Sequence, residues 1–503
     1  MHEHNLLILS DLHLSEGLDP ASGRFSRLED FWYDGAFARF LRYHERVRGQ
    51  PRFGGRPWTL VINGDLFDFL QVVSLPREGR LLRAVRGVAS FGDLPPNERE
   101  YGLGTTAAES AWKLHRIACG HQRFFAALGR FVAHGNHVAV VKGNHDVELY
   151  WPQVQERFRR EVARAYAREW RMVGEGPPLS SEACRARIQF YPWFYYEPGR
   201  VYVEHGGQYQ AANRFRDFVN PVLPGDPARI ELPWGSLFVR YLFNEIEDVH
   251  PFADNVKPIK RYLGWAFRKD PLGTVEVLLT RGWIFLRAAW KVARKTAVST
   301  RHHGRAHASP VQTGPASLPP HVRERIAALA QRWVDVSWQE WAGSSVYALL
   351  SLLTVLIALT FVVLAGLTLG DGLSWITGVY LAAAAVAFFL RRGLRRVASA
   401  LFESNYLLRA AAGVQRILGT GHAVGYVVMG HDHRAALERM GRAWYVNTGA
   451  WVPVYEEEGP IEGREELTFF RLAWAHEGTP ELLRWDDAAG APARATLWRD
   501  AGS

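Results

Sequence analysis

Cysteine is scarce in this sequence, which holds only Cys119 and Cys184 among its 503 residues. Two thiols cannot form a disulfide framework, so the sequence is not that of a disulfide-stabilised secreted scaffold. The first residues also lack the basic segment, apolar stretch and cleavage site of a secretory signal, and none is expected. Both cysteines lie outside the motifs described below, which predicts small buried side chains in a reducing compartment.

Disorder as the overall state is excluded by the apolar content of the chain. Hydrophobic residues make up 48% of it, with 19 Trp and 27 Phe, which is enough to fill a sizeable core. The formal net charge is +9. A basic chain suits nucleic acid, an anionic membrane face or an anionic substrate, so charge alone does not identify the partner.

Five short apolar runs, typical of buried strands, each end in residues that bind metals or phosphate. The runs are residues 6–9, 60–62, 138–141, 201–203 and 426–429. They are followed by Asp11 and His13, by Asp65 and Asp68, by Asn144, His145 and Asp146, by His205, and by His431, Asp432 and His433. Loops at strand ends commonly carry functional side chains, so we expect a metal or phosphate site there.

The motifs occur in the order Asp-Xaa-His, Gly-Asp-Xaa-Xaa-Asp, Gly-Asn-His-Asp, a single His and Gly-His-Xaa-His. In this they resemble the calcineurin-like metallophosphoesterase family. One Asp-Xaa-His is a weak signal, whereas five blocks in order, each at a strand end, are a strong one. The resemblance covers about residues 1–210 and 420–480. It implies an α/β fold in which a two-sheet sandwich is flanked by helices (α/β/β/α).

The resemblance also implies a centre of two divalent metal ions bridged by the carboxylate of Asp65. It places Asp11, His13 and His433 around one ion, and Asn144, His205 and His431 around the other. Manganese is the expected metal, with iron, zinc and magnesium as alternatives. Such ions act as Lewis acids on phosphoryl oxygens and acidify a water that lies between them.

By the same resemblance, His145 is a histidine that does not bind metal but stabilises the transition state or protonates the leaving oxygen. Asp146 is expected to orient its ring. The alternative is a structural loop histidine. Asp68 and Asn447 are expected to support ligands without binding metal, and Asp432 is expected to be solvated.

The segments between the motifs have the spacing of ordinary helices and strands. Helices are predicted within residues 30–48 and over 107–132, 147–173, 322–343 and 397–418. Strands are predicted over residues 187–196, 467–475 and 481–485, with the last two completing the second sheet.

The middle of the chain contains two uncharged runs, residues 341–370 and 372–390. Each is long enough to cross about 30 Å of hydrocarbon as a helix. A buried hairpin in a soluble helical domain is the alternative. The length of the first run, the tryptophans at its start and the short Gly370-Asp371-Gly372 connection favour a transmembrane hairpin.

The flanking charges predict how this hairpin is oriented. Four arginines follow the second run, while the connection between the runs has no Lys or Arg, so both outer flanks are expected in the cytoplasm. His205 precedes the hairpin and His431 follows it, so a shared metal site requires an even number of crossings. We expect a two-span protein of the cell inner membrane with a cytoplasmic catalytic domain.

These observations predict an interrupted domain organisation. The predicted parts are a first phosphoesterase part (1–212), an aromatic and basic helical cap or interfacial insert (213–300), a flexible linker (301–320), a helix with the hairpin (321–396, spans 346–369 and 373–390), a second phosphoesterase part (397–486) and a tail (487–503).

The motifs predict the reaction but not the substrate. They look most like the UDP-2,3-diacylglucosamine hydrolase branch, although the long insert departs from it. A lipid-linked phosphoester or pyrophosphate at the membrane is the leading expectation. The alternatives are a membrane-tethered phosphodiesterase or phosphatase for a soluble nucleotide or protein, a nuclease, and a non-catalytic scaffold. Nucleic acid is the less favoured partner, and the oligomeric state is left open.

Overall fold

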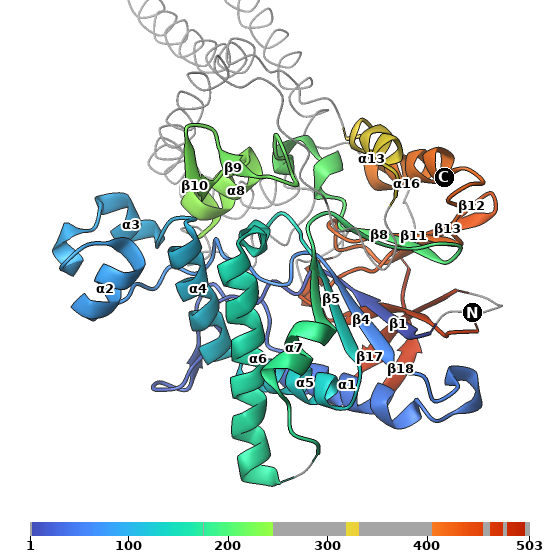
Figure 1. Ribbon diagram of the computed structural model, residues 1–503, viewed down its shortest axis with the longest axis horizontal. Helices are drawn as coiled ribbons and strands as arrows, with labels where there is room; N and C mark the ends of the chain where they lie inside the picture. Colours follow the sequence, from blue (N-terminus) through green and yellow to red (C-terminus); the bar gives the residue numbers. More distant parts are fainter. Residues whose placement is uncertain are drawn as a thin grey trace, which may run out of the picture.

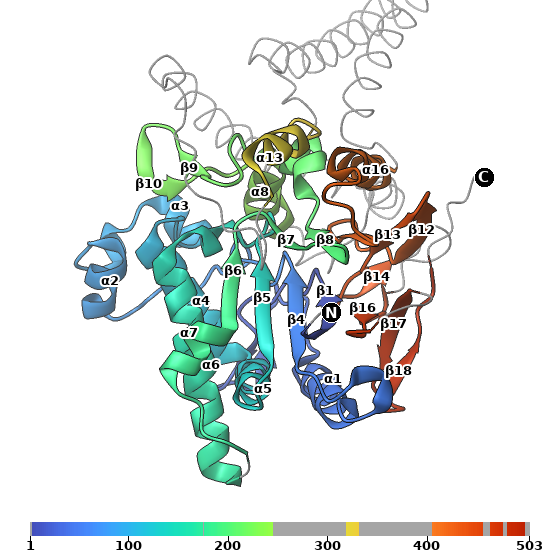
Figure 2. The ribbon, with the colours of Figure 1, turned by 45° about the vertical axis from the view of Figure 1, so that its right-hand side comes forward.

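Two β-sheets lie face to face between two layers of helices in the computed structural model (Figures 1 and 2). The structure describes residues 3–174, 176–244, 318–330, 405–455, 463–475 and 480–497. Within these residues the predicted two-sheet α/β architecture flanked by helices is confirmed.

The first sheet has seven strands in the order β18-β17-β16-β1-β4-β5-β6. Its strands are β1 (Asn5–Leu9), β4 (Trp58–Asn63), β5 (His137–Val141), β6 (Ile188–Tyr191), β16 (Thr468–Leu472), β17 (Glu481–Asp486) and β18 (Ala491–Arg494). The strands β1, β4, β5 and β6 are parallel, and β16 joins β1 antiparallel. The carboxyl ends of the parallel strands therefore share one edge of the sheet.

The second sheet has five strands in the order β12-β13-β11-β8-β7. Its strands are β7 (Phe194–Glu197), β8 (Val201–Glu204), β11 (Tyr426–Met429), β12 (Ala436–Met440) and β13 (Ala443–Asn447). The strand β11 is parallel to both β8 and β13, so the ends that carry the histidine motifs also share one edge.

Alternating side chains of each strand explain how the layers hold together. On β1, Leu7 and Leu9 join the core beneath the helices, while Leu6 and Ile8 join the core between the two sheets. Because both faces are covered, the strand is apolar from Leu6 to Leu9, which is why it shows as an uninterrupted apolar run.

The helix α1 (Asp34–Val47) covers the outer face of the first sheet together with α4 (Ala107–Gly120), α5 (Gln122–Ala133) and α6 (Pro152–Val173). The side chain of Thr106 accepts the Glu109 N–H, and Glu109 accepts the Thr106 N–H in return, so a capping box starts α4. The outer face of the second sheet is covered by α13 (Pro320–Ala327) and α16 (Tyr406–Leu418).

The remaining elements are short. They are β2 (Leu18–Asp19), β3 (Arg24–Phe25), η1 (Pro51–Phe53), α2 (Gly79–Arg86), η2 (Phe91–Asp93), α3 (Pro96–Tyr101), η3 (Val147–Tyr150), α7 (Ser181–Arg187), η4 (Gly207–Tyr209), η5 (Ala211–Asn213), β9 (Val222–Leu223), β10 (Asp226–Ile230), α8 (Trp234–Phe238), η6 (Val239–Phe243), β14 (Val454–Tyr455) and β15 (Gly463–Arg464).

Two predicted elements are divided in the structure. The helix predicted over 107–132 ends at Gly120, where an added Cβ atom would lie 1.9 Å from the carbonyl oxygen of Glu16, and α5 starts after His121. The strand predicted over 187–196 is two strands, β6 in the first sheet and β7 in the second. The chain therefore changes sheets at Pro192 and Trp193.

Two predictions about the end of the chain were wrong. The strands β16 and β17 complete the first sheet, through the pairing of β16 with β1, and not the second. The predicted tail, residues 487–503, contains β18, which pairs with β17 at the edge of that sheet. Its sequence, Ala-Pro-Ala-Arg, gives no strand signal, and Pro492 is tolerated because β18 is an edge strand.

None of the helices in the described part of the chain is long and apolar enough to cross a membrane. The predicted spans, residues 346–369 and 373–390, lie outside the described residues, as do residues 301–317 of the predicted linker 301–320 and most of the predicted insert. The hairpin, the membrane location and the domain boundaries there stay predictions.

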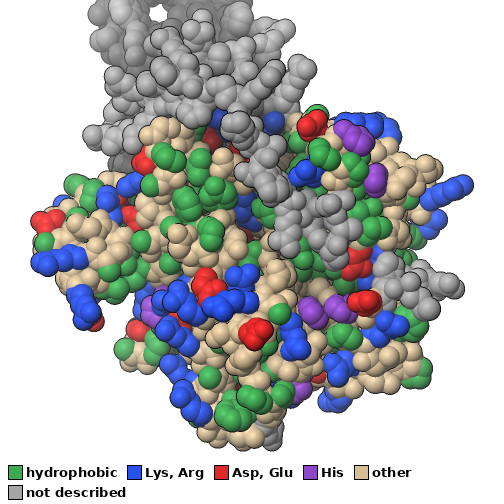
Figure 3. Space-filling view, in the orientation of Figure 1, with side chains coloured by type: hydrophobic (Ala, Val, Ile, Leu, Met, Phe, Trp, Pro, Cys, Tyr) green, Lys and Arg blue, Asp and Glu red, His purple; other side chains and the backbone are tan. Residues whose placement is uncertain are grey.

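Acidic side chains are scattered among more numerous basic ones on the face of the molecule shown in Figure 3. On α6, Arg157 pairs with Glu161 at 2.6 Å, and Glu156 pairs with Arg185 of α7 at 3.1 Å. Part of the positive charge of the chain is thus balanced by local ion pairs.

Candidate metal centre

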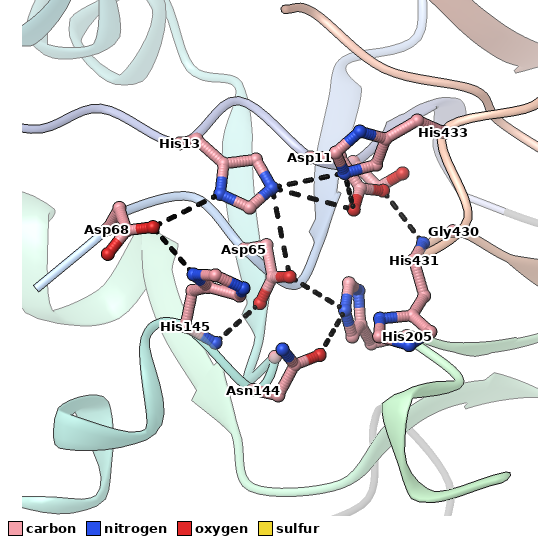
Figure 4. A network of polar contacts seen from close by, with 12 residues as sticks. Asp11, His13, Asp65, Asp68, Asn144, His145, His205, Gly430, His431 and His433 are labelled. Atoms are coloured by element: carbon pink, nitrogen blue, oxygen red, sulfur yellow. Dashed lines mark hydrogen bonds and ion pairs between the residues drawn. The ribbon is translucent and has the colours of Figure 1, made fainter. Parts of the chain in front are cut away.

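The five predicted motifs meet where the carboxyl edges of the two sheets face each other (Figure 4). The loops after β1, β4 and β5 bring the aspartates, Asn144 and His145 from the first sheet. The loops after β8 and β11 bring His205, His431 and His433 from the second. Residues more than 400 positions apart in the sequence are in contact here, as in the pair of His13 and His433.

The backbone of the site is held in an unfavourable conformation. Seven described residues other than glycine have a φ in the left-handed region, and five of them belong to the site. These five are Asp11, His13, Asp65, His431 and His433. Each such conformation costs about 1–3 kcal/mol and persists only where the surroundings enforce it, as at functional sites.

One group of candidate ligands consists of Asp11, His13 and His433. The Nε2 atom of His433 lies 3.2 Å from Oδ1 of Asp11 and 3.2 Å from Nε2 of His13. Two imidazole nitrogens and a carboxylate oxygen thus converge on one point. Nitrogen and oxygen donors together are the set that borderline divalent ions prefer.

A second group contains Asp65, His205 and His431. The Nε2 atom of His205 lies 3.0 Å from Oδ2 of Asp65 and 3.1 Å from Oδ1 of Asn144. The other ring nitrogen, Nδ1, lies 2.9 Å from the backbone carbonyl oxygen of Asn63 and donates its proton to it. This bond leaves the lone pair of neutral His205 on Nε2, the nitrogen that faces the group.

Asp65 lies between the two groups. Its Oδ2 atom is 3.0 Å from Nε2 of His205 and 3.9 Å from Nε2 of His13. Its Oδ1 atom accepts the backbone N–H of His145 at 2.9 Å. A carboxylate in this position is suited to contact two ions at once.

The charges of the site also suit cations. Burial by itself would raise the pKa of the Asp11 and Asp65 carboxyl groups, but the neighbouring histidines hold both pKa values well below their ordinary range. Burial would lower the pKa of His205, yet Asp65 raises it to about 9. Two buried carboxylates therefore require positive charge, and divalent ions can supply it in place of the histidine protons.

Among His13, His145, His205 and His433, the side chain of His145 is the most exposed to solvent. Its side chain is 14% exposed, against 5% or less for His13, His205 and His433. Its Nδ1 atom lies 2.6 Å from Oδ2 of Asp68, a fully buried carboxylate. Burial opposes the charge on the ring, but Asp68 and Asp65 raise the pKa of His145 above its ordinary value.

The expectation that Asp146 orients the ring of His145 was wrong. The carboxylate of Asp146 accepts two backbone N–H groups, from Gly143 at 2.6 Å and from Leu66 at 2.8 Å. It therefore ties the loop after β5 to the loop after β4. Asp68, the last residue of the Gly-Asp-Leu-Phe-Asp motif at residues 64–68, orients the ring instead.

The remaining polar residues of the motifs support the loops. Asn447 donates from Nδ2 to the Gly430 carbonyl oxygen at 2.9 Å and to Oδ1 of Asp432 at 2.7 Å. The supporting position expected for Asn447 is what the structure shows. Asp432, which we expected to be solvated, instead accepts two hydrogen bonds at Oδ1, from Nδ2 of Asn447 and from the backbone N–H of Arg434.

Sequence reasoning missed Gln210 and Asn213. The Oε1 atom of Gln210 lies 2.7 Å from Nε2 of His431, and Nδ2 of Asn213 lies 2.6 Å from the same oxygen. In the sequence, both residues lie in a stretch with polar side chains soon after His205. This stretch has no periodicity, so nothing distinguishes it from an ordinary loop.

Comparison with known proteins supports the same chemistry. The model of the calcineurin-like phosphoesterase family matches residues 4–273. No curated protein and no solved structure gives a significant match. The family uses a dinuclear centre of divalent metals, and the His and Asp groups described above are candidate ligands for one. Since the family match spans more than half of the sequence, the chain belongs to the calcineurin-like phosphoesterase family and is a metal-dependent phosphoester hydrolase.

Proposed function

We propose that the two ions are held by the residues that meet at the sheet edges. Asp11, His13 and His433 hold one ion, Asn144, His205 and His431 hold the other, and Asp65 contacts both. The observation that carries this proposal is the position of Asp65 between the two groups. Bound ions of this kind polarise phosphoryl oxygens and activate water, and manganese is the metal that we propose.

His145 serves as the proton donor to the leaving oxygen in this proposal. Its ring is the most accessible of the four compared above, so a substrate can reach it. Asp68 accepts the Nδ1 proton and stabilises a positive charge on the ring, which leaves Nε2 to hold and deliver a proton. Asp68 is thus a positioning residue.

The proposed substrate is a lipid-linked phosphoester, such as a UDP-diacylglucosamine-type pyrophosphate, at the cytoplasmic face of the inner membrane. The support comes from the sequence. Two uncharged runs at residues 346–369 and 373–390 suit a membrane hairpin, and aromatic and basic residues at 213–295 suit a membrane surface. A catalytic site held at the membrane suits a substrate with acyl chains in the bilayer and phosphate in water.

The experiment compares hydrolysis of that pyrophosphate, in mixed micelles, with hydrolysis of a soluble phosphodiester by the full-length protein with added Mn²⁺. Asp65→Ala is expected to abolish both metal binding and turnover. His145→Ala is expected to bind metal but lose turnover by about 100-fold or more. His422→Ala, a partly buried histidine after α16, is the control that should match the wild type.

The outcomes separate the parts of the proposal. Turnover of the lipid pyrophosphate alone supports a lipid substrate. Turnover of the soluble diester alone would overturn the lipid substrate while leaving the metal centre in place. Full activity of Asp65→Ala would overturn the two-metal site.

A further inference from the structure

The side chain of Gln210 links a candidate metal ligand to the segment that leaves the phosphoesterase sheets. Its Oε1 atom lies 2.7 Å from Nε2 of His431. The Nδ2 group of Asn213 donates to the same Oε1 atom at 2.6 Å and lies 3.4 Å from Nε2 of His431. Gln210 and Asn213 are also joined through the backbone, because the Asn213 N–H donates to the Gln210 carbonyl oxygen at 3.1 Å.

This contact selects one tautomer of His431. Of the two polar atoms near Nε2 of His431, the acceptor Oε1 of Gln210 is much closer, at 2.7 Å, than the donor Nδ2 of Asn213, at 3.4 Å. An amide oxygen can only accept, so Nε2 carries a proton that it donates to Gln210. A neutral imidazole with a proton on Nε2 has its lone pair on Nδ1. A metal ion bound by His431 must then use Nδ1, and Gln210 holds the ring in the protonation state that this requires.

The same amide network reaches the start of the inserted region. A Cβ atom added to Gly235, in α8, would lie 2.0 Å from Oδ1 of Asn213 and 3.2 Å from the backbone carbonyl oxygen of Ala212. The helix α8 therefore packs directly on Asn213 and has room for it only because residue 235 is glycine. A displacement of α8 would move Asn213, which contacts His431 both directly, at 3.4 Å from Nε2, and through Oε1 of Gln210.

We propose that Gln210 is a positioning residue for His431 and that Asn213 couples its position to α8. The start of the inserted region, at α8, thereby helps to set the metal affinity of the site. This inference rests on the proposed function, because it takes His431 to be a ligand. The chemistry that Gln210 provides is a hydrogen-bond acceptor of fixed position, which a side chain of the same length without an acceptor cannot supply.

The test measures Mn²⁺ binding to the full-length protein by isothermal titration calorimetry, without substrate. Gln210→Met keeps the length of the side chain and removes the acceptor, and it should weaken binding about 10- to 100-fold. Gln210→Glu keeps an acceptor and should restore binding. Gln415→Met is the matched control, since Gln415 is also a partly buried glutamine, bonded to the Met440 carbonyl oxygen and away from the metal centre.

A second pair of variants tests the coupling. Gly235→Ala touches neither His431 nor any other candidate ligand, yet it should weaken Mn²⁺ binding in the same direction as Asn213→Ala. Gly421→Ala, where a Cβ meets nothing within 4 Å, should bind Mn²⁺ like the wild type. Thermal melting of the metal-free proteins identifies any variant that is misfolded.

The results distinguish this inference from the proposed function. Unchanged Mn²⁺ binding by Gln210→Met, or equal losses in Gln210→Met and Gln210→Glu, would overturn the positioning role. Unchanged binding by a folded Gly235→Ala would overturn the coupling. Asp65→Ala serves as the reference: if it too binds Mn²⁺ normally, the metal site itself is misassigned.

Discussion

Oδ2 of Asp68 lies 2.6 Å from Nδ1 of His145, while its Oδ1 accepts the backbone N–H groups of Leu70 at 2.8 Å and Gln71 at 3.2 Å. The two oxygens of this buried carboxylate therefore contact different groups. One supports the loop after β4, and the other supports the ring that we propose as the proton donor.

This division makes Asp68→Asn an informative variant. Its amide oxygen is expected to keep the bonds to the two backbone N–H groups, which turns the NH₂ group toward His145. A donor facing Nδ1 disfavours the doubly protonated ring, so kcat should fall by about 100-fold or more. The measurement is steady-state kinetics at saturating Mn²⁺.

A double-mutant cycle tests whether Asp68 acts through His145. In the His145→Ala background, Asp68→Asn should cause almost no further loss of kcat. Losses that multiply in the double variant would show that Asp68 acts by another route, for instance through His13, whose Nδ1 lies 3.6 Å from the same carboxylate oxygen.

Asp146 has a different task, and its removal should affect stability first. Asp146→Ala leaves the buried N–H groups of Gly143 and Leu66 without their acceptor. We expect the free energy of unfolding to fall by about 2–4 kcal/mol. Urea denaturation measures it, and His145→Ala should change stability far less.

The control for Asp146→Ala is Asp19→Ala. The carboxylate of Asp19 also accepts two backbone N–H groups, from Ala21 and Ser22, but in an exposed loop. Water can replace it there, so the cost should stay within about 0.5 kcal/mol. Equal costs for the two variants would show that burial of the Asp146 bonds contributes nothing.

The positions at which the parallel strands end could be predicted from the sequence, because each strand appears there as a continuous apolar run. Parallel strands covered on both faces, such as β4 and β5, consist mainly of apolar residues, and their carboxyl ends must share an edge. Residues that directly follow these strands, such as Asp65 and Asn144, therefore lie close together, however the strands are connected.

The choice between two nearby carboxylates could not be predicted. Asp146 follows His145 directly in the sequence, but its side chain turns back to the backbone N–H groups of two loops. Asp68 is 77 positions away and reaches the ring through the pairing of β4 with β5. Likewise, β16 has apolar side chains that suit either sheet, and only its pairing with β1 decides its place.

Gly143 provides a steric test of the bridging carboxylate. A Cβ atom there would lie 2.1 Å from Oδ1 of Asp65 and 2.4 Å from its backbone nitrogen. Because the backbone cannot yield easily, Gly143→Ala should displace Asp65 and weaken Mn²⁺ binding by about 10-fold or more. Calorimetry measures the loss, and binding as tight as in the wild type would argue against Asp65 as the shared ligand.

A buried histidine away from the metal centre predicts how stability depends on pH. His121 is fully buried between Glu29, at 3.2 Å from Nε2, and Asp34, at 2.9 Å from Nδ1. Burial alone would lower the pKa of His121, but these two carboxylates raise it to about 10, from an ordinary value of 6.5. The charged ring therefore stabilises the folded state fully below pH 6.5, and this contribution is lost as the pH rises from 6.5 toward 10.

The variant that tests this is His121→Gln, compared with the wild type by urea denaturation at several pH values across that range. The wild type should lose a few kcal/mol more stability than the variant as the pH rises. His44→Gln is the control, because burial lowers the pKa of His44 to about 3 and the ring stays neutral throughout the range. If His121→Gln and His44→Gln show the same pH dependence as the wild type, His121 is not charged in the folded protein, and its two carboxylate neighbours must be balanced in another way.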